Sequence, residues 1–377
     1  MLNTIFIASV SLILYSYIGY PISLYMLGLF IKKNVLKKDV FPPTTIIITA
    51  YNEEKRIRGK IHNTLEIIYP EDNLQIIIAS DGSSDSTNEI VESFNYTKIQ
   101  LLVIPIRSGK EKAQKEALKI ARGEVIVFTD VATFIEPLGI KKIVLNFADP
   151  TIGCVSSVDR FIGRDGTPSG EGVYVRYEML LRRLESRVNS LVGLSGSFFA
   201  ARKSVLKDFK GDMQSDFRTL LNCIKIGFRG ISDQEVTGSY LDISDTSQEF
   251  DRKIRTVLRG LTVYFHHLEL LNVLKYGLFS YQYFCHKLLR WLVPFFLISS
   301  FIANFFLALR SDIYFLLFLG QLFFYGIGLL GWFGRKYRSI NAIKIPYYFL
   351  TVNISILIAW WRFLGRERVV MWTPSER

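Results

Sequence analysis

The stretch Val125-Ile126-Val127-Phe128-Thr129-Asp130 decides the fold of this chain. Its first four residues are apolar and are β-branched or aromatic, which predicts a strand buried on both faces inside a parallel sheet. The stretch ends in the carboxylate of Asp130. Open α/β sheets bind ligands in the crevice outside the carboxyl ends of their strands. The sequence therefore predicts that Asp130 lies where a ligand would bind.

Two other apolar runs end in the same way. Residues 45–50 lead into Tyr51-Asn52-Glu53-Glu54, and residues 74–80 lead into Asp81-Gly82-Ser83-Ser84-Asp85. Because the carboxyl ends of parallel strands meet at one edge of a sheet, we expect these acidic and polar loops to converge near Asp130.

Strands alternate with helical stretches through this region. The predicted strands lie near 45–50, 74–80, 99–104 and 124–129, and the helices between them near 53–68, 86–95 and 110–121. This βαβ alternation predicts a mostly parallel sheet in an α/β domain over residues 42–260. Further along, we predict helices near 138–147, 174–188, 214–226 and 248–259, and strands near 152–161.

Apolar segments flank this domain. Of the 377 residues 49% are hydrophobic although 21% are charged, which suggests a polar domain joined to membrane helices. Residues 1–31 carry no charge and are followed by Lys32-Lys33, which predicts a transmembrane anchor with the next domain in the cytoplasm.

The C-terminal part continues this pattern. We predict interfacial amphipathic helices over 261–287, transmembrane helices within 288–365 and a basic tail at 366–377. The chain is thus expected to be an integral protein of a plasma or inner membrane. Basic residues follow the last apolar run as well as the one before it, so the number of crossings and the side of the C-terminus stay open.

The net charge of +12 suits a nucleic acid, an anionic membrane face or a phosphate-bearing substrate. Juxtamembrane lysines account for much of it, so we expect a lipid bilayer and no nucleic acid as partner. The three cysteines, Cys154, Cys223 and Cys285, show no metal-ligand spacing. They fit a reducing compartment and indicate neither disulfides nor zinc.

Three aspartates could combine in one mechanism. Asp130 is placed to bind a divalent cation together with phosphate oxygens. Asp81 could accept a hydrogen bond from a base or a ribose, with turn capping equally plausible, while capping is the better interpretation of Asp85. Asp216 is a candidate general base, although a carboxylate in the first turn of a helix is the commoner explanation from spacing alone.

Two basic groups could bind phosphate. Lys110 follows Arg107-Ser108-Gly109 at a predicted helix N-terminus, without the glycine run of a Walker loop. Arg252, Arg255 and Arg259 share one side of a helix, where they could hold a diphosphate or face lipid headgroups. Position alone does not separate these two uses.

Taken together, the motifs resemble those of membrane-bound family 2 glycosyltransferases, the group that includes cellulose, hyaluronan and poly-N-acetylglucosamine synthases. The matching motifs are Thr49-Ala50-Tyr51-Asn52-Glu53-Glu54, Ser80-Asp81-Gly82-Ser83-Ser84-Asp85, Gly109-Lys110, Phe128-Thr129-Asp130, Gly196-Ser197 with Phe198-Phe199-Ala200, Ser215-Asp216-Phe217 and Arg252-Lys253-Ile254-Arg255. The ending Trp372-Thr373-Pro374-Ser375-Glu376-Arg377 also resembles this group.

The resemblance implies a GT-A fold, meaning a Rossmann-like, mostly parallel sheet, and an inverting transferase that uses Mg²⁺ or Mn²⁺. It implies Asp216 as the general base. The substrate-binding positions it implies are Tyr51, Glu53 and Asp81 for the nucleoside, Lys110 for the nucleotide, Asp130 for the metal and diphosphate, Arg252 and Arg255 for the diphosphate at a gating segment, and Ser195, Gly196 and Ser197 at the turn that meets the acceptor sugar.

The chain departs from the family pattern at two positions. The metal motif is often Asp-x-Asp, whereas residue 132 is Ala, so we expect a single protein carboxylate on the metal. Processive members usually have Trp where this chain has Thr256, so a stacking surface for the acceptor is absent there.

Two functional hypotheses follow from these observations. The preferred one is sugar transfer from a nucleotide sugar, expected to be UDP-linked, to a growing polysaccharide or lipid-linked acceptor. The alternative is a non-catalytic membrane scaffold or partner subunit with a degenerate nucleotide-sugar site. The sequence indicates neither which sugar and acceptor are used, nor an export channel, nor an oligomeric state.

Overall fold

The computed structural model describes the chain except for residues 163–172, 242–245, 335–336, 338–339 and 370–377. The chain packs into two units, which we describe separately. The sheet unit comprises Leu24–Ser244, Val263–Phe279 and Val369–Arg377, and the apolar-helix unit comprises Met1–Ser23, Asp245–Thr262 and Ser280–Arg368.

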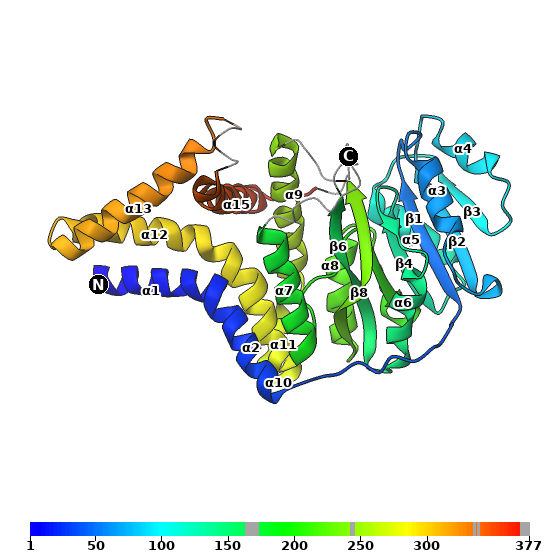
Figure 1. Cartoon of the computed structure of the whole chain (residues 1–377), viewed down its shortest axis with the longest axis horizontal. Helices are drawn as coiled ribbons and strands as arrows, with labels where there is room; N and C mark the ends of the chain where they lie inside the picture. The colour runs from blue at the N-terminus through cyan, green and yellow to red at the C-terminus, as the bar shows by residue number, and fades with distance from the viewer. Residues whose placement is uncertain (163–172, 242–245, 335–336, 338–339, 370–377) are drawn as a thin grey trace. The chain divides into compact units, whose positions relative to one another are not determined.

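One eight-stranded sheet forms the centre of the sheet unit, with the order β3-β2-β1-β4-β7-β6-β8-β5 (Figure 1). Its strands are β1 (Thr44–Ala50), β2 (Leu74–Asp81), β3 (Ile99–Ile104), β4 (Val125–Asp130), β5 (Phe134–Ile135), β6 (Ile152–Ile162), β7 (Phe198–Arg202) and β8 (Arg229–Leu241). The four strands β3, β2, β1 and β4 are parallel. The predicted, mostly parallel sheet is therefore confirmed.

Strand β7 interrupts the parallel order because it runs antiparallel between β4 and β6. Beyond it, β8 pairs in parallel with β6 through two register shifts. Strands at residues 198–202 and 229–241 were not predicted from the sequence. Strand β7 is only five residues long, and Gly230 and Gly238 break the apolar pattern of β8.

Apolar residues of β4 alternate between the two faces of the sheet. Val125 and Val127 join a core with side chains of α3 and α6, while Ile126 and Phe128 join a second core with side chains of α5 and α8. The helices of this unit are α3 (Ile57–Leu65), α4 (Thr87–Ser93), α5 (Lys110–Ile120), α6 (Gly139–Leu145), α7 (Val173–Val188), α8 (Ser215–Lys225) and the short α10 (Val273–Tyr276). Because β4 is packed on both faces, the position of its carboxyl end in the sheet is fixed.

Four helices in the described part of the chain are long and apolar enough to cross a membrane, judged by length and composition. They are Leu2–Phe30, Leu278–Ala308, Asp312–Leu330 and Ala342–Leu364. In helix labels these are α1 (Leu2–Leu14) with α2 (Tyr20–Phe30), α11 (Leu278–Tyr283) with α12 (Arg290–Ala308), α13 (Asp312–Leu330), and α15 (Asn341–Leu364). The number of membrane crossings stays a prediction, because length and composition alone select these helices. Within the apolar-helix unit, α1 packs on α12, and α13 packs on α15.

Two predicted boundaries fall inside helices. Helix α9 runs over Thr246–Phe265 and so continues past residue 260, and the chain is helical without a break from Leu278 to Ala308. Lys287 and Arg290 interrupt the uncharged run that the sequence analysis used, but neither residue interrupts a helix, because long straight side chains have good helix propensity.

Candidate active site

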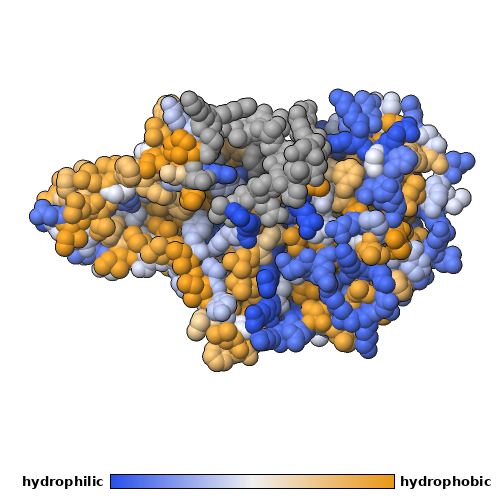
Figure 2. Space-filling model, in the orientation of Figure 1, coloured by the Kyte–Doolittle hydropathy of each residue, from blue (hydrophilic) through white to orange (hydrophobic). Residues whose placement is uncertain are grey.

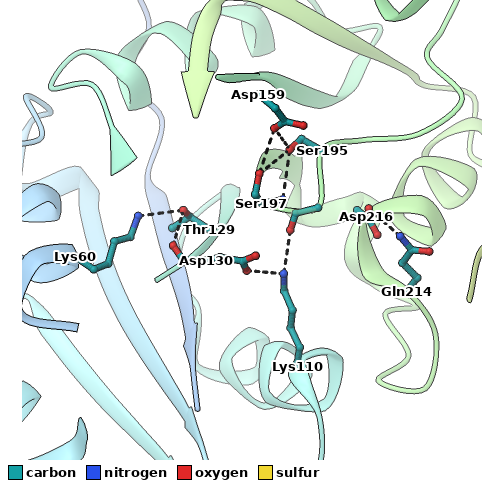
Figure 3. A network of polar contacts seen from close by, with 10 residues as sticks. Lys60, Lys110, Thr129, Asp130, Asp159, Ser195, Ser197, Gln214 and Asp216 are labelled. Atoms are coloured by element: carbon teal, nitrogen blue, oxygen red, sulfur yellow. Dashed lines mark hydrogen bonds and ion pairs between the residues drawn. The ribbon is translucent and has the colours of Figure 1, made fainter. Parts of the chain in front are cut away.

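The carboxylate of Asp130 lies at the end of β4, as predicted, and meets the first residue of α5. The Nζ atom of Lys110 lies 2.5 Å from the Oδ1 atom of Asp130. The same ammonium group donates a hydrogen bond of 2.9 Å to the carbonyl oxygen of Gly196 (Figure 3). A strand end, a helix N-terminus and the turn before β7 thus meet at one ammonium group.

Asp216 joins the same site from the first turn of α8. A Cβ atom built on Gly196 would lie 3.1 Å from the Oδ2 atom of Asp216, so this carboxylate lies directly against the glycine. The Nε2 atom of Gln214 donates to that oxygen at 3.2 Å. Asp130 and Asp216 therefore lie on either side of the contact between Lys110 and Gly196 (Figure 3).

The turn at residues 195–197 is fixed by polar groups of β6. The Oγ atoms of Ser195 and Ser197 lie 2.5 and 3.2 Å from Oδ1 of Asp159, to which they donate. The backbone N–H of Ser195 donates to the Oγ of Ser156 at 2.7 Å. Asp159 and Ser156 were not predicted as site residues from the sequence, although the predicted strand near 152–161 carries an Asp near its end, as the other strands do.

Asp81 holds the loop that precedes α5. It is 2% exposed, and its carboxylate accepts hydrogen bonds from the N–H and Oγ of Ser108 at 2.7 and 3.0 Å and from the N–H of Gly109 at 2.8 Å. Gly109 has a φ of 103°, a backbone conformation that L side chains rarely adopt. Asp81 therefore sets where α5 begins and where Lys110 points.

Tyr51 contacts the same loop. The guanidinium of Arg107 lies 3.8 Å from the centre of the Tyr51 ring. Near it, Arg56 makes hydrogen bonds of 2.7 and 2.9 Å to the two carboxylate oxygens of the buried Glu53. Burial raises the pKa of Glu53 in spite of the charge on Arg56.

Asp85 caps the turn before α4, in line with the interpretation favoured from the sequence. Its carboxylate accepts hydrogen bonds from the N–H of Glu54 at 3.1 Å and from the N–H of Thr87 at 3.1 Å. Burial raises the pKa of Asp85, but the hydrogen bonds from Thr87 and Glu54 outweigh it and hold this pKa below its ordinary value.

Lys60 is a buried lysine beside the site, and it was not predicted as a site residue from the sequence. It is 0% exposed, and its Nζ donates to the Oγ1 of Thr129 at 3.1 Å (Figure 3) and to the carbonyl oxygen of Thr133 at 2.5 Å. Burial lowers its pKa to about 7, while the charge on Asp130 acts in the opposite direction. The available signal was a lysine on the buried face of α3, three residues after Ile57.

Arg252 and Arg255 belong to α9 in the apolar-helix unit. Their predicted contact with a diphosphate therefore stays a prediction. The ending at residues 372–377 lies outside the described residues.

In the described part of the chain, no three His, Cys, Asp or Glu residues gather closely enough to hold a metal ion by themselves. Asp130 is the one carboxylate at the end of β4, because residue 132 is Ala. Mg²⁺ in proteins is commonly held by one or two carboxylates, with substrate phosphates and water completing its shell. The donor set at Asp130 fits such an ion only together with the oxygens of a phosphate ligand.

Comparison with known proteins places this site in a domain of known type. Residues 45–209 match the family model described as glycosyl transferase family 2. The chain is 28% identical over 169 residues to the poly-beta-1,6-N-acetyl-D-glucosamine synthase of Staphylococcus epidermidis, covering 44% of this chain and 40% of that protein. It is 27% identical over 179 residues to the probable glycosyltransferase YdaM of Bacillus subtilis, covering 45% and 43%. The matched region thus spans less than half the length of these curated relatives.

A solved structure resembles the chain over nearly its whole length. The mannosyltransferase PcManGT from Pyrobaculum calidifontis, solved in complex with GDP-Man and Mn²⁺, has a TM-score of 0.77 and 21% sequence identity. The match covers 98% of this chain and 100% of that one. The fold is therefore a GT-A sheet domain accompanied by long apolar helices, as the resemblance in the sequence implied.

Proposed function

Since this chain is a family 2 glycosyltransferase by virtue of its domain at residues 45–209, we propose that it transfers a hexose from a UDP-linked sugar to a polysaccharide or lipid-linked acceptor at a membrane. The observation that carries this proposal is the convergence of Asp130, Lys110, Gly196 and Asp216 at the carboxyl edge of the sheet. These groups come from four separate segments of the chain, and each has a use in the reaction.

Asp216 is the proposed general base. It takes the proton of the acceptor hydroxyl while the oxygen of that hydroxyl attacks the anomeric carbon of the donor sugar. The bond from this carbon to the diphosphate breaks on the opposite side, so an α-linked donor gives a β-linked product. Gln214 holds Oδ2 of Asp216 at 3.2 Å, which leaves Oδ1 for the acceptor.

Lys110 and Asp130 are proposed to bind the diphosphate. An ammonium group that already pairs with a carboxylate at 2.5 Å can move to a phosphate oxygen with little change of position. Asp130 would hold Mg²⁺ or Mn²⁺ together with the diphosphate oxygens, and such an ion neutralises the charge of the departing group. The Mn²⁺ named for PcManGT supports this choice of cofactor.

The turn at residues 195–197 is proposed to meet the acceptor sugar. Asp159 holds both serine hydroxyls of this turn, and Gly196 lies against the base. Tyr51, Glu53 and Asp81 are proposed to line the nucleoside site. We place the catalytic domain on the cytoplasmic side, where nucleotide sugars are available, because Lys32 and Lys33 follow the first apolar helix.

The test is transfer by the full-length protein in detergent or nanodiscs, with a panel of radiolabelled UDP and GDP sugars. The panel includes GDP-mannose because PcManGT was solved with it. Transfer from a UDP sugar that stops on addition of EDTA and returns with Mg²⁺ or Mn²⁺ supports the proposal. Transfer from GDP-mannose alone would overturn the UDP assignment, and donor binding without any transfer would favour a non-catalytic scaffold.

Asp216→Asn tests the base. We expect kcat to fall by about 100- to 10,000-fold, the usual contribution of general base catalysis, with donor affinity unchanged because Asp216 is assigned to the acceptor side. Asp72→Asn is the matched control, since Asp72 is exposed before β2. Near-full turnover in Asp216→Asn would remove this residue from the base role.

A further inference from the structure

A basic hollow lies at the opposite end of the sheet from the candidate active site. It has a volume of about 600 Å³, and its lining includes Lys32, Lys33, Arg229, Lys275 and Asp149. Arg229 is the first residue of β8 and pairs with Ile152, the first residue of β6. The active-site turn contacts Asp159 near the other end of β6. The hollow is therefore separate from the proposed donor site.

The acidic residue in this lining is already engaged. Oδ1 of Asp149 accepts hydrogen bonds from the N–H and Oγ1 of Thr151 at 2.9 and 2.7 Å, and Oδ2 accepts one from the N–H of Leu36 at 3.2 Å. Burial raises the pKa of Asp149, but these hydrogen bonds and the charge on Arg229 hold it below its ordinary value. One anion thus faces four cations, and its oxygens are directed to backbone and hydroxyl groups.

Two cations of the hollow, Arg229 and Lys33, donate hydrogen bonds to neutral oxygen atoms. Arg229 donates to the carbonyl oxygens of Asn189, Lys33 and Asn34 at 3.3, 3.1 and 3.2 Å. Lys33 donates through Nζ to Oδ1 of Asn189 at 2.8 Å. Burial and the charge on Arg229 together lower the pKa of Lys33. Like charges are thus held close together, and an anion bound between them would relieve their repulsion.

The position of these residues along the chain points to a membrane surface. Lys32 and Lys33 directly follow the first membrane-span candidate, which ends at Phe30, and Lys275 lies three residues before the second, which begins at Leu278. Basic residues at helix ends lie at the depth of lipid headgroups.

Exposed apolar side chains lie next to Lys32 and Lys275 in the chain. Phe30 is 85% exposed, Val273 is 63% exposed and Leu274 is 100% exposed. Figure 2 shows hydrophobic residues over the end of α2 and over α10, at the lower end of the view, with hydrophilic residues beside them. A free phosphate ion makes no favourable contact with exposed apolar side chains. A lipid has both a charged headgroup for the basic residues and acyl chains for the apolar ones.

We propose that this hollow binds the phosphate headgroup of an anionic bilayer lipid, with Lys32, Lys33, Arg229 and Lys275 around the phosphate. Phe30, Val273 and Leu274 contact the start of the acyl chains. The site anchors the sheet unit to an anionic membrane surface, and this role is independent of the proposed transferase reaction.

The test uses full-length protein in a non-ionic detergent, titrated with short-chain phosphatidylglycerol, with phosphatidylcholine of the same chain length, and with glycerol phosphate. Binding is followed by native mass spectrometry and by thermal stabilisation. We expect phosphatidylglycerol to bind more tightly than either other probe. Equal binding of the two lipids would overturn the proposal, and equal binding of glycerol phosphate and phosphatidylglycerol would assign the site to free phosphate esters instead.

Two variants locate the site. Replacing Lys32, Lys33 and Lys275 with Gln should weaken phosphatidylglycerol binding by about 100-fold, since each basic residue near an anionic headgroup contributes roughly a factor of five. Leu274→Ser should weaken phosphatidylglycerol binding while leaving glycerol phosphate binding as in the wild type.

The matched control removes three exposed lysines of α5, which are Lys112, Lys115 and Lys119. It carries the same change of charge on another surface of the sheet unit. Equal loss of lipid affinity in this control would show that net charge, rather than the hollow, attracts the lipid, and would overturn the proposal.

Discussion

Replacing the buried Lys60 with Met should remove a pH-dependent cost from the folded protein. Lys60 is 0% exposed, and burial lowers its pKa from 10.5 to about 7. The cationic form is therefore disfavoured in the folded state relative to the unfolded state. This cost is fully present below pH 7 and disappears as the pH rises toward 10.5. The difference between these two pKa values is about 3.5, which corresponds to roughly 5 kcal/mol in the free energy of unfolding between the low-pH and high-pH limits, at about 1.4 kcal/mol per pH unit.

The pH range over which unfolding is compared is narrower than the range between the two pKa values. Between pH 6 and 9 the wild type should gain about 3 kcal/mol in free energy of unfolding relative to Lys60→Met. For a domain of this size that corresponds to a change of about 6–12 °C in the difference between the two Tm values. The loss of the hydrogen bonds to Thr129 and Thr133 adds an offset that does not vary with pH, so the trend isolates the charge.

The assay is thermal unfolding of both full-length proteins across this pH series, followed by near-UV circular dichroism. Groups that titrate in both proteins cancel in the difference. Lys55→Met is the control, because it removes the same charge from an exposed position two residues before α3. A flat or falling difference for Lys60→Met would refute the assignment of a desolvated ammonium group.

Three other substitutions test the site and the core. Gly196→Ala places a Cβ atom 3.1 Å from Oδ2 of Asp216, so we expect kcat to fall by about tenfold or more, with Tm unchanged; full activity would separate this turn from the base. Lys110→Met should weaken UDP binding by about 10- to 100-fold in calorimetric titration, the contribution of a charged hydrogen bond, and unchanged affinity would remove Lys110 from the diphosphate site. Phe128→Ala should lower the free energy of unfolding by about 3–5 kcal/mol, because Phe128 stacks on Phe199 at 4.9 Å; a loss below 1 kcal/mol in a denaturant titration would contradict this packing.

The strands that carry the site could be predicted because their signals are local. Each of β1, β2 and β4 is a continuous apolar run that ends in a polar loop, and burial on both faces requires that composition. Strand β7 could not be predicted in the same way, because its place in the sheet depends on pairing with β4 on one side and β6 on the other. No property of Phe198–Arg202 itself specifies those partners.

Among the residues of the site, too, some could be predicted from the local sequence and others could not. Asp130 and Lys110 could be selected because they occupy a strand end and a helix start, where a ligand-binding group is expected. Asp216 was selected by the family resemblance, since a carboxylate in the first turn of a helix has a commoner structural explanation. Asp159 and Lys60 act through tertiary hydrogen bonds to Ser195 and to Thr133, and these partners are distant in sequence. The spacing of residues along the sequence does not reveal such contacts.

The charges around Asp130 bear on how the proposed diphosphate site would work with Ala at residue 132. The charge on Asp130 acts to raise the pKa of the buried Lys60, and the ammonium of Lys110 forms an ion pair with Asp130. The charge of Lys110 therefore lies directly beside this carboxylate, and Lys60, whose pKa burial lowers to about 7, adds positive charge only in its protonated form. A second carboxylate at residue 132 would cancel positive charge that a diphosphate needs, whereas Ala132 leaves it in place. Lys110 can then move to the phosphate while Lys60 continues to fix the turn from Thr129 to Thr133. Under the proposed function, Ala at residue 132 is therefore compatible with a diphosphate site to which Lys110 supplies positive charge.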